Sequence, residues 1–165
     1  MERRNFLKSL SGISLLIAFP AMAAAAAIKP LLKTNQAWRN LLPANRYNIL
    51  FEEGTEHAGS SPLNHEKRAG TFICAACNFP LFSSETKYDS GTGWPSFWRS
   101  LPDAVATKTD YHMILPRTEY HCARCSGHQG HIFNDGPKPT GKRYCNNGLA
   151  LEFVPDGAKL PELRT

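Results

Sequence analysis

Five cysteines are the residues with the clearest capacity for chemistry, and four of them form two C-x-x-C pairs. The pairs are Cys74 with Cys77 and Cys122 with Cys125. A two-residue spacing lets both sulfurs of a loop face one ion, and two such loops supply the four thiolates of a tetrahedral zinc site. One Zn²⁺ per chain, fully ligated by protein, would be structural, and its binding energy would be largely folding energy. A redox pair, two disulfides and an iron–sulfur centre are the alternatives, and two pairs together favour zinc.

The fifth cysteine, Cys145, has no cysteine partner in this scheme and is the candidate nucleophile. A thiolate is the attacking form, and a cation such as Arg143, two residues away, favours it by lowering the pKa of the thiol. His128 and His131 would add to this effect if the chain folds them against the sulfur. The alternatives are a buried structural cysteine and, for the two histidines, a second metal pair.

The segments that must position these groups change character along the chain. Apolar side chains at residues 35–42 have helical spacing, and Pro43 suits the first residue of a second helix that runs to about residue 53. One further helical turn is expected at residues 65–69. The first 70 residues therefore supply short helices rather than the main body of the domain.

From Gly70 onward, short extended segments alternate with turns. Extended segments are expected at residues 71–73, 80–82, 86–88, 104–108, 111–115, 118–121, 132–133 and 149–154. Twelve Gly and twelve Pro agree with many turns. The pattern predicts a mainly β fold: an antiparallel, barrel-like β domain with short N-terminal helices and a four-cysteine zinc site.

The first 27 residues are typical of an export leader. Arg3-Arg4-Asn5-Phe6-Leu7-Lys8 resembles a twin-arginine signature, an apolar stretch follows, and Ala21-Met22-Ala23 suits cleavage. We expect export to the periplasm and no stable membrane association after cleavage, with an uncleaved membrane anchor as the alternative. Twin-arginine export of a folded, zinc-loaded domain would reconcile four thiolates with an oxidising destination.

The remaining organisation is that of one domain. Residues 28–34 are expected to be a linker, 35–155 the domain and 156–165 a C-terminal surface tail. The net charge is +5 over 165 residues, and two of these charges fall in the leader, where Arg3, Arg4 and Lys8 outnumber Glu2. The other charges are interspersed, which does not favour nucleic acid as a partner. A zinc-ribbon nucleic-acid binder stays open as a competing interpretation.

Several motifs together resemble the methionine-R-sulfoxide reductases of the B type, in the order that this family has. They are the two C-x-x-C pairs, Ser90-Gly91-Thr92-Gly93-Trp94-Pro95-Ser96-Phe97, residues 127–137, Gly141-Lys142-Arg143-Tyr144-Cys145 and Asn147. The resemblance implies an enzyme that reduces methionine-R-sulfoxide, mainly in oxidised proteins or peptides, and so repairs them. A non-catalytic binding module built on the same zinc scaffold is the rival interpretation.

The resemblance also implies roles for single residues. Cys145 would attack the sulfoxide sulfur and be left as a sulfenic acid. His128 and His131 would act at the sulfoxide oxygen as hydrogen-bond donors or a proton source, because this oxygen must gain protons as the S–O bond breaks. Asn147 would help to hold the same end of the substrate.

Other matched positions would surround the reacting atoms. Trp94 would form an apolar wall for the ε-methyl group, with Phe133 beside it, and Asp135 and Arg143 would set the environment of the cysteine. Sulfur, oxygen and methyl group would then each have a place, which selects one epimer; its assignment as R comes from the family.

The chain departs from many members of this family at Thr92, where they carry a second, resolving cysteine. Threonine cannot form a disulfide, and the other four cysteines are assigned to zinc. We therefore expect a one-cysteine cycle in which an external thiol, from a thioredoxin-like protein or another thiol reductant, reduces Cys145 through a mixed disulfide. We expect the enzyme to be a monomer.

Overall fold

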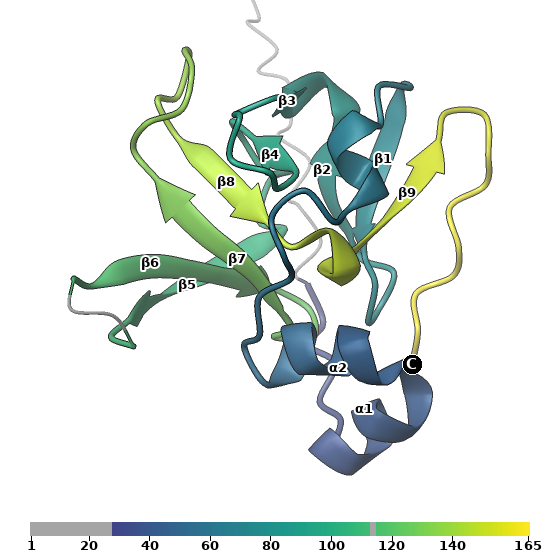
Figure 1. Cartoon of the computed structure of the whole chain (residues 1–165). Helices are drawn as coiled ribbons and strands as arrows, with labels where there is room; N and C mark the ends of the chain where they lie inside the picture. The colour runs from purple at the N-terminus through teal and green to yellow at the C-terminus, as the bar shows by residue number, and fades with distance from the viewer. Residues whose placement is uncertain (1–27, 113–114) are drawn as a thin grey trace, which may run out of the picture.

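The computed structural model describes residues 28–112 and 115–165 (Figure 1), so the predicted leader at residues 1–27 lies outside the described residues. Two short helices come first, α1 (Asn35–Leu41) and α2 (Ala44–Phe51). The Oγ1 atom of Thr34 accepts a hydrogen bond from the Ala37 N–H (3.2 Å) and starts α1. Among the described residues, no helix has the length and apolar content needed to span a membrane.

Two details of the predicted helices are wrong. Pro43 is the capping residue before α2 rather than its first residue, because its ψ of 143° is extended while its carbonyl already accepts from the Tyr47 N–H at 2.9 Å. The helical turn expected at residues 65–69 lies earlier, at η1 (Pro62–His65). Ser61 caps this turn through its Oγ atom, and the backbone becomes extended at Glu66.

Two antiparallel sheets form most of the domain. The smaller sheet has the order β2-β1-β9, with bounds β1 (Gly70–Cys74), β2 (Pro80–Ser83) and β9 (Leu151–Pro155). The larger sheet has the order β3-β4-β8-β7-β6-β5. Its bounds are β3 (Lys87–Tyr88), β4 (Ser96–Phe97), β5 (Val105–Asp110), β6 (Arg117–Cys122), β7 (His128–Phe133) and β8 (Arg143–Asn146). Two further short turns are η2 (Ser84–Thr86) and η3 (Gly148–Ala150).

The mainly β, antiparallel prediction with short N-terminal helices is confirmed, but the expected barrel is not closed. Over the described ranges, each sheet keeps two edge strands: β3 and β5 in the larger, β2 and β9 in the smaller. Strands β3 and β4 have only two residues each and cannot extend the ladder around a barrel. Figure 1 shows the long β5–β6 ribbon projecting away from the smaller sheet.

The extended segment expected at residues 111–115 is also wrong for its described members. Strand β5 ends at Asp110, whose Oδ1 atom accepts from the His112 N–H (2.8 Å) and turns the chain. Tyr111, His112 and Leu115 belong to the connection to β6, and residues 113–114 lie outside the described ranges.

An aromatic core joins the two sheets. Phe82 of β2 stacks on Phe97 of β4 with ring centroids 4.2 Å apart, and Phe72 of β1 meets the same ring at 4.9 Å. These three rings are fully buried. Because β4 pairs with β8, this packing fixes the strand that carries Cys145 against the smaller sheet.

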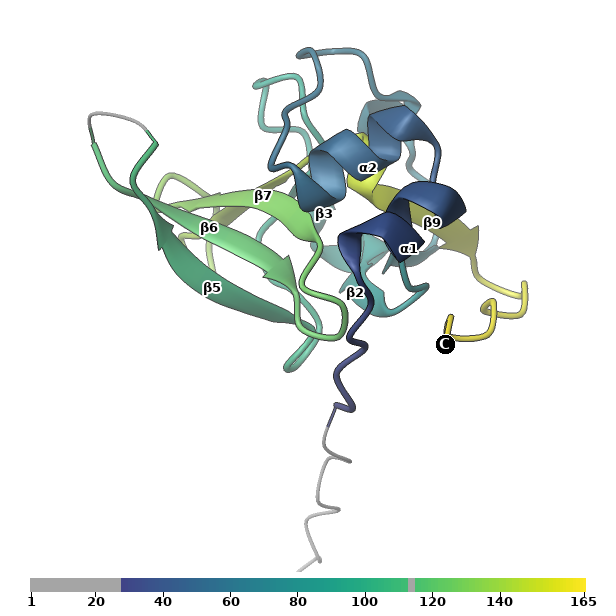
Figure 2. The ribbon, with the colours of Figure 1, turned by 90° about the horizontal axis from the view of Figure 1, so that it is seen from below.

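The two helices close the end of the domain where β7 begins. Trp38 of α1 stacks on Phe51 of α2 with ring centroids 4.9 Å apart, and buried Leu50 of α2 lies against Gly127 just before β7. Figure 2 shows α1 and α2 side by side along this end. The helices therefore support the strand that carries the two histidines.

Both flanking segments touch the cysteine loops. The predicted linker, residues 28–34, has no helix or strand, and its Leu31 N–H donates to the Arg124 carbonyl (2.6 Å). In the tail at 156–165, the Arg164 N–H donates to the Cys77 carbonyl (3.2 Å), and Asn78 Nδ2 donates to the Glu162 carbonyl (2.8 Å). The tail is mostly exposed, yet it lies across the first cysteine loop.

Candidate functional site

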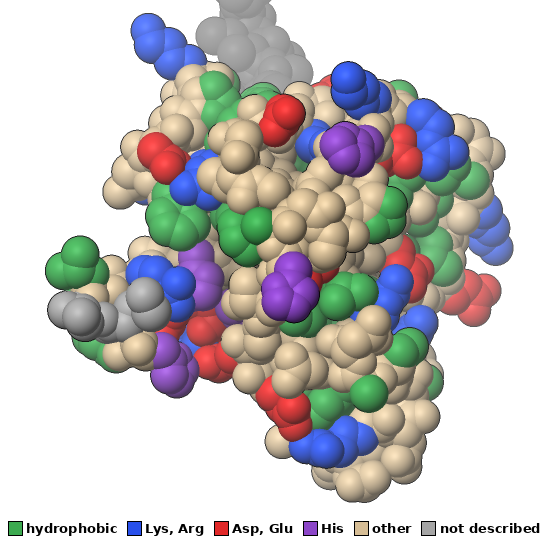
Figure 3. Space-filling view, viewed as in Figure 1, with side chains coloured by type: hydrophobic (Ala, Val, Ile, Leu, Met, Phe, Trp, Pro, Cys, Tyr) green, Lys and Arg blue, Asp and Glu red, His purple; other side chains and the backbone are tan. Residues whose placement is uncertain are grey.

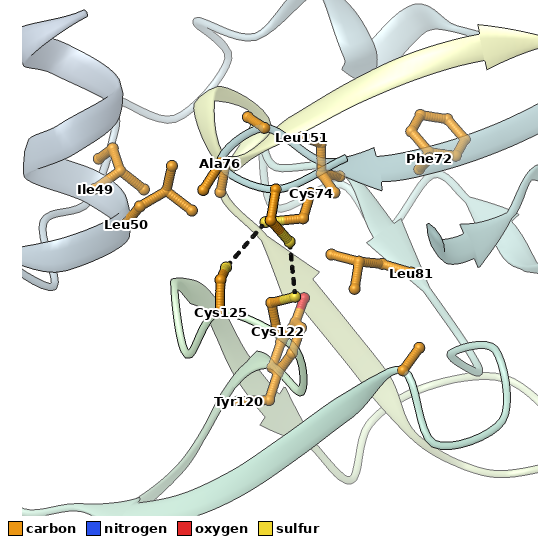
Figure 4. Packing of buried hydrophobic residues seen from close by; sticks show 14 of the residues in the cluster. Ile49, Leu50, Phe72, Cys74, Ala76, Leu81, Tyr120, Cys122, Cys125 and Leu151 are labelled. Carbon is orange, nitrogen blue, oxygen red and sulfur yellow. Dashed lines mark hydrogen bonds between the residues drawn. The ribbon is translucent and has the colours of Figure 1, made fainter. Parts of the chain in front are cut away.

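The four paired cysteines meet at one buried point, as predicted. Their Sγ atoms all lie within 4.8 Å of one another, with 3.7 Å between Cys74 and Cys125 and 3.6 Å between Cys77 and Cys122. Figure 4 shows these contacts between the two loops. Four sulfurs at zinc-bond length from one ion stand about 3.8 Å apart, whereas a disulfide needs about 2.05 Å. The sulfurs are therefore spaced for a metal ion.

The two cysteine loops are the same turn used twice. Asn78 and Ser126 each follow the second cysteine of a pair, with φ of 61° and 60°. Each also donates its N–H to the carbonyl of the first cysteine, at 2.8 Å from Asn78 to Cys74 and 2.9 Å from Ser126 to Cys122. Such turns bring both sulfurs of a pair to one side, which explains why spacing alone predicted the cluster.

Cys145 lies elsewhere, half-buried in β8 at the wall of a pocket of about 200 Å³. It pairs with Ser96 of β4 on one side and with His131 of β7 on the other. Residues directly opposite in an antiparallel pair project to the same face of the sheet. The pocket is lined by Thr55, Trp94, Arg117, Gly130, His131, Phe133, Cys145, Asn146 and Asn147.

A β-bulge places the two histidines on one face. Residues three apart in a regular strand point to opposite faces, but Gly130 pairs with Tyr120 while His128 pairs with His121, so Gln129 is the extra residue. The rings of His128 and His131 are therefore neighbours, with centroids 5.5 Å apart. Only His131 lines the Cys145 pocket.

His128 instead faces a second, polar cavity of about 210 Å³. It is 3% exposed, and its Nδ1 atom lies 2.9 Å from Oε1 of Glu119. His131 belongs to both cavities and so stands between them. Figure 3 shows histidine, acidic and basic side chains gathered over the β5–β7 part of the molecule.

Trp94 and Asn147 are both fixed by the backbone of Glu56. The indole Nε1 of Trp94 donates to the Glu56 carbonyl (3.2 Å), and Oδ1 of Asn147 accepts from the Glu56 N–H (3.1 Å). Nδ2 of Asn147 donates to the Gln129 carbonyl (3.2 Å). The buried carboxylate of Glu56 accepts hydrogen bonds from the backbone N–H groups of Gly148 (2.6 Å) and Leu149 (2.9 Å). The predicted indole wall and amide are thus positioned by one residue that the sequence did not single out.

The predicted pair Asp135 and Arg143 is a two-bond ion pair beside the pocket. Nε and Nη2 of Arg143 donate to the two carboxylate oxygens of Asp135, each at 2.8 Å. The guanidinium also covers the ring of Phe133, 4.2 Å from its centroid. The carboxylate therefore holds a buried cation next to the strand position of Cys145.

Opposing effects act on the thiol of Cys145. Burial raises its pKa above the ordinary value, and the charge of Arg143 and the hydroxyl of Thr92 oppose this effect. The hydroxyl of Thr92 lies 2.8 Å from that of Ser90, which in turn lies 2.8 Å from the hydroxyl of Ser96. Thr92, where the family resemblance led us to look for a resolving cysteine, thus supplies a hydroxyl group.

Sequence reasoning missed Asp110 and Arg117. They are opposite residues at the end of the β5–β6 pair, and Nη2 of Arg117 donates to Oδ2 of Asp110 (2.6 Å). Oδ2 also lies 2.8 Å from Nε2 of His131. Only the hairpin register brings these residues to the histidine, and the extended segment wrongly expected at 111–115 hid that register.

Known proteins resemble this chain over most of its length. A family model described as the SelR domain matches residues 42–155. A peptide methionine sulfoxide reductase MsrB of Leptospira interrogans serogroup Icterohaemorrhagiae serovar Lai is 48% identical over 122 residues, covering 73% of this chain and 93% of that protein. The protein of the same name from Pseudomonas putida is 47% identical over 129 residues, covering 76% and 96%. A third, from Thiobacillus denitrificans, is 49% identical over 124 residues, covering 74% and 94%.

Proposed function

The chain belongs to the SelR-domain family of B-type methionine sulfoxide reductases, and we propose that it reduces methionine-R-sulfoxide, chiefly in proteins, with Cys145 as its nucleophile. The enzyme is an oxidoreductase that acts on methionine sulfoxide. The observation that carries the finer proposal is the pocket that Cys145 shares with Trp94 and His131.

The chemical step moves one oxygen from sulfur to sulfur. The thiolate of Cys145 attacks the sulfoxide sulfur, the S–O bond to methionine breaks, and methionine leaves as a thioether. The oxygen ends on Cys145 with one proton, as a sulfenic acid, so a thiol and a sulfoxide become a sulfenic acid and a thioether. His131 lines the Cys145 pocket and would donate to this oxygen. His128 faces the second cavity and would act from the far side of the His131 ring.

The pocket walls suit the rest of the substrate. Trp94 and Phe133 offer apolar surface to the ε-methyl group, and the buried amide of Asn147 completes the polar end. An epimer with oxygen and methyl exchanged would place its oxygen against the indole, where it would lack hydrogen-bond partners. The R preference follows the family.

Regeneration requires an external thiol. A first thiol converts the sulfenic acid to a mixed disulfide and releases water, and a second thiol frees Cys145. The other four cysteines are buried in their own cluster, and position 92 is a threonine, which supports a one-cysteine cycle with a thioredoxin-like or other thiol donor.

The cysteine cluster is proposed to hold one structural Zn²⁺. Its four sulfurs are buried and correctly spaced, and Nε2 of Gln129 points to Sγ of Cys74 at 3.6 Å, as expected for a donor beside a metal-bound thiolate. When bound, the ion would contribute folding energy and no reaction step. Elemental analysis should give one zinc per chain, and a value near zero in freshly purified protein would refute the assignment.

Export is proposed from the leader alone. Arg3 and Arg4 before an apolar stretch, with Ala21-Met22-Ala23 behind it, support a cleaved twin-arginine signal and a periplasmic location. N-terminal sequencing of the exported protein should begin between residues 24 and 28. We also propose a monomeric enzyme without a nucleic-acid partner, which gel filtration with and without DNA would test.

The decisive test of function compares wild type with Cys145→Ser on resolved R and S sulfoxides. Wild type should reduce only the R epimer, and Cys145→Ser should be inactive while keeping its zinc and its thermal unfolding midpoint. After one turnover without reductant, dimedone should label Cys145. Equal activity in Cys145→Ser would point to another nucleophile, and no activity in wild type on either epimer would favour a non-catalytic scaffold. An intramolecular disulfide at Cys145 would exclude the one-cysteine cycle.

A further inference from the structure

Asp110 gathers polar hydrogens from three residues at a buried point behind the Cys145 pocket. Its Oδ2 atom lies 2.8 Å from Nε2 of His131 and accepts from Nη2 of Arg117 at 2.6 Å. Its Oδ1 atom accepts from the backbone N–H of His112 at 2.8 Å and lies 2.8 Å from Nδ1 of the same residue. The side chain is almost fully buried.

These contacts favour an ionised carboxylate. A backbone N–H and a guanidinium can only donate, so both oxygens of Asp110 accept a hydrogen bond, and the guanidinium charge favours the carboxylate over the neutral acid. The donors, led by the His112 N–H, hold the pKa of Asp110 well below its usual range. An ionised carboxylate has no proton to give, and Nε2 of His131 must therefore carry the hydrogen that they share.

This fixes which nitrogen of His131 remains for chemistry. With Nε2 held by Asp110, Nδ1 is the only ring nitrogen left to serve the pocket that His131 shares with Cys145. We infer that Asp110 is a positioning residue: it holds His131 in the Nε2–H form and stabilises the ring when Nδ1 is also protonated. The inference rests on the proposed function.

The hydrogen position on His131 matters because the reaction removes one proton and delivers another. The thiol of Cys145 gives up one proton to become the attacking thiolate, and the sulfoxide oxygen gains one as its bond to methionine breaks. Nδ1 of His131 can receive the first proton and deliver the second, so nothing is left over. A carboxylate on the far nitrogen stabilises the imidazolium between these two events, as in hydrolase triads.

The charged groups around His131 bear on its protonation, and one of them is buried Glu119 of β6, which pairs directly with His131 and lines the same polar cavity. Burial is the largest influence and lowers the pKa of His131, and Arg117 of β6 and His128 of β7 lower it further. Asp110 of β5 is the group that raises it, and the thiol of Cys145 faces the ring across the pocket from β8. Removing the negative charge of Asp110 should therefore lower the pKa of His131 below its value in the wild-type protein.

A purely structural role is the competing explanation, because Asp110 and Arg117 also tie together the end of the β5–β6 pair that lies next to the connection between these strands. The test is Asp110→Asn, with His112→Ala as its matched control. His112→Ala removes an exposed neighbour of the same carboxylate but leaves both contacts of Oδ2 intact.

We expect Asp110→Asn to lower kcat about ten- to a hundredfold, below the largest effects known for such pairs because Arg117 shares the carboxylate. KM should change by less than about twofold, because Asp110 does not reach the substrate. The activity limb that falls with rising pH should move to lower pH, since fewer His131 rings would be protonated. His112→Ala should keep kcat and the pH profile of wild type.

A second measurement needs no variant. Nitrogen NMR of wild-type His131 should show the Nε2–H form of the neutral ring, and a predominantly Nδ1–H ring would overturn the inference even if Asp110→Asn fails to fold. An Asp110→Asn enzyme with wild-type kcat and pH profile would also overturn it. Failure of the proposed function would look different, because wild type itself would then be inactive on both epimers.

Discussion

Replacement of Gly130 should move the strand that carries His131 away from the strand that carries Cys145. Gly130 lies on β7 next to His131 and pairs with Asn146 of β8. A Cβ atom at this position would stand 1.9 Å from the carbonyl oxygen of Cys145 and 3.0 Å from its carbonyl carbon. Ordinary contact begins near 3.4 Å, so Gly130→Ala should force the two backbones apart by about 1.5 Å.

The cost follows from what is displaced. Both close atoms are backbone atoms, so no side-chain rotation relieves the clash, and overpacking of this kind costs about 1–3 kcal/mol. Loss of one or two ladder hydrogen bonds adds about 0.5–1.5 kcal/mol each. The sum, about 1.5–6 kcal/mol, is a large part of the roughly 5–15 kcal/mol available to a domain, so the variant should be clearly less stable than wild type.

Activity should fall more steeply than stability. His131 and Cys145 face each other across the ladder that Gly130→Ala opens. A displacement of about 1 Å between reacting groups costs on the order of a hundredfold in rate. Urea unfolding of the zinc-loaded protein measures the loss of stability. The kcat on a peptide containing methionine-R-sulfoxide measures the loss of activity.

Gly157→Ala is the matched control. Gly157 has φ of 86°, and a Cβ atom added there would have no neighbour within 4 Å, so its replacement should cost about 1–2 kcal/mol of backbone strain and leave kcat unchanged. If Gly130→Ala unfolds at the same urea concentration as Gly157→Ala and keeps wild-type kcat, close approach of β7 and β8 does not set the geometry of the site.

Two other predictions concern the thiol and the tail. Arg143→Gln removes a charge that lowers the pKa of Cys145, so alkylation of Cys145 by iodoacetamide at pH 7–8 should slow severalfold; an equal or faster rate would contradict this role. Deletion of residues 156–165 removes the contact of the tail with the Cys77 carbonyl, so a chelator should extract zinc faster than from wild type. Glu162→Ala, which keeps the backbone carbonyl of the tail contact, should release zinc at the wild-type rate.

The metal cluster was predictable from sequence because its geometry is local. Each C-x-x-C loop closes on itself through two backbone hydrogen bonds of its first cysteine. The Cys74 carbonyl accepts from Asn78 and its N–H donates to the Phe79 carbonyl, and Cys122 does the same with Ser126 and Gly127. Only the meeting of the two loops depends on the fold. A shared metal ion is the usual partner of four buried cysteines in two matching loops. Two such loops in one small domain therefore predict a common ion.

The acid–base part of the site was less predictable because it depends on register. Cys145, His131 and Asp110 belong to β8, β7 and β5, and they meet only because each strand pairs with a definite offset. A shift of one residue would turn any of them to the opposite face. The odd cysteine and the resemblance to a family together supplied Cys145 and His131, whereas Asp110 required the pairing of β5 with β6.

The bulge at Gln129 links the four-cysteine cluster to the Cys145 pocket. Gln129 is fully buried and turns inward, where its Nε2 atom lies 3.6 Å from Sγ of Cys74 and its Oε1 atom 3.4 Å from Nδ2 of Asn146. The same extra residue brings His128 and His131 to the opposite face. Without the bulge, regular alternation would separate the histidines and move Gln129 out of register with the cysteines. A single irregularity in β7 therefore connects the sulfur cluster to the residue that follows Cys145.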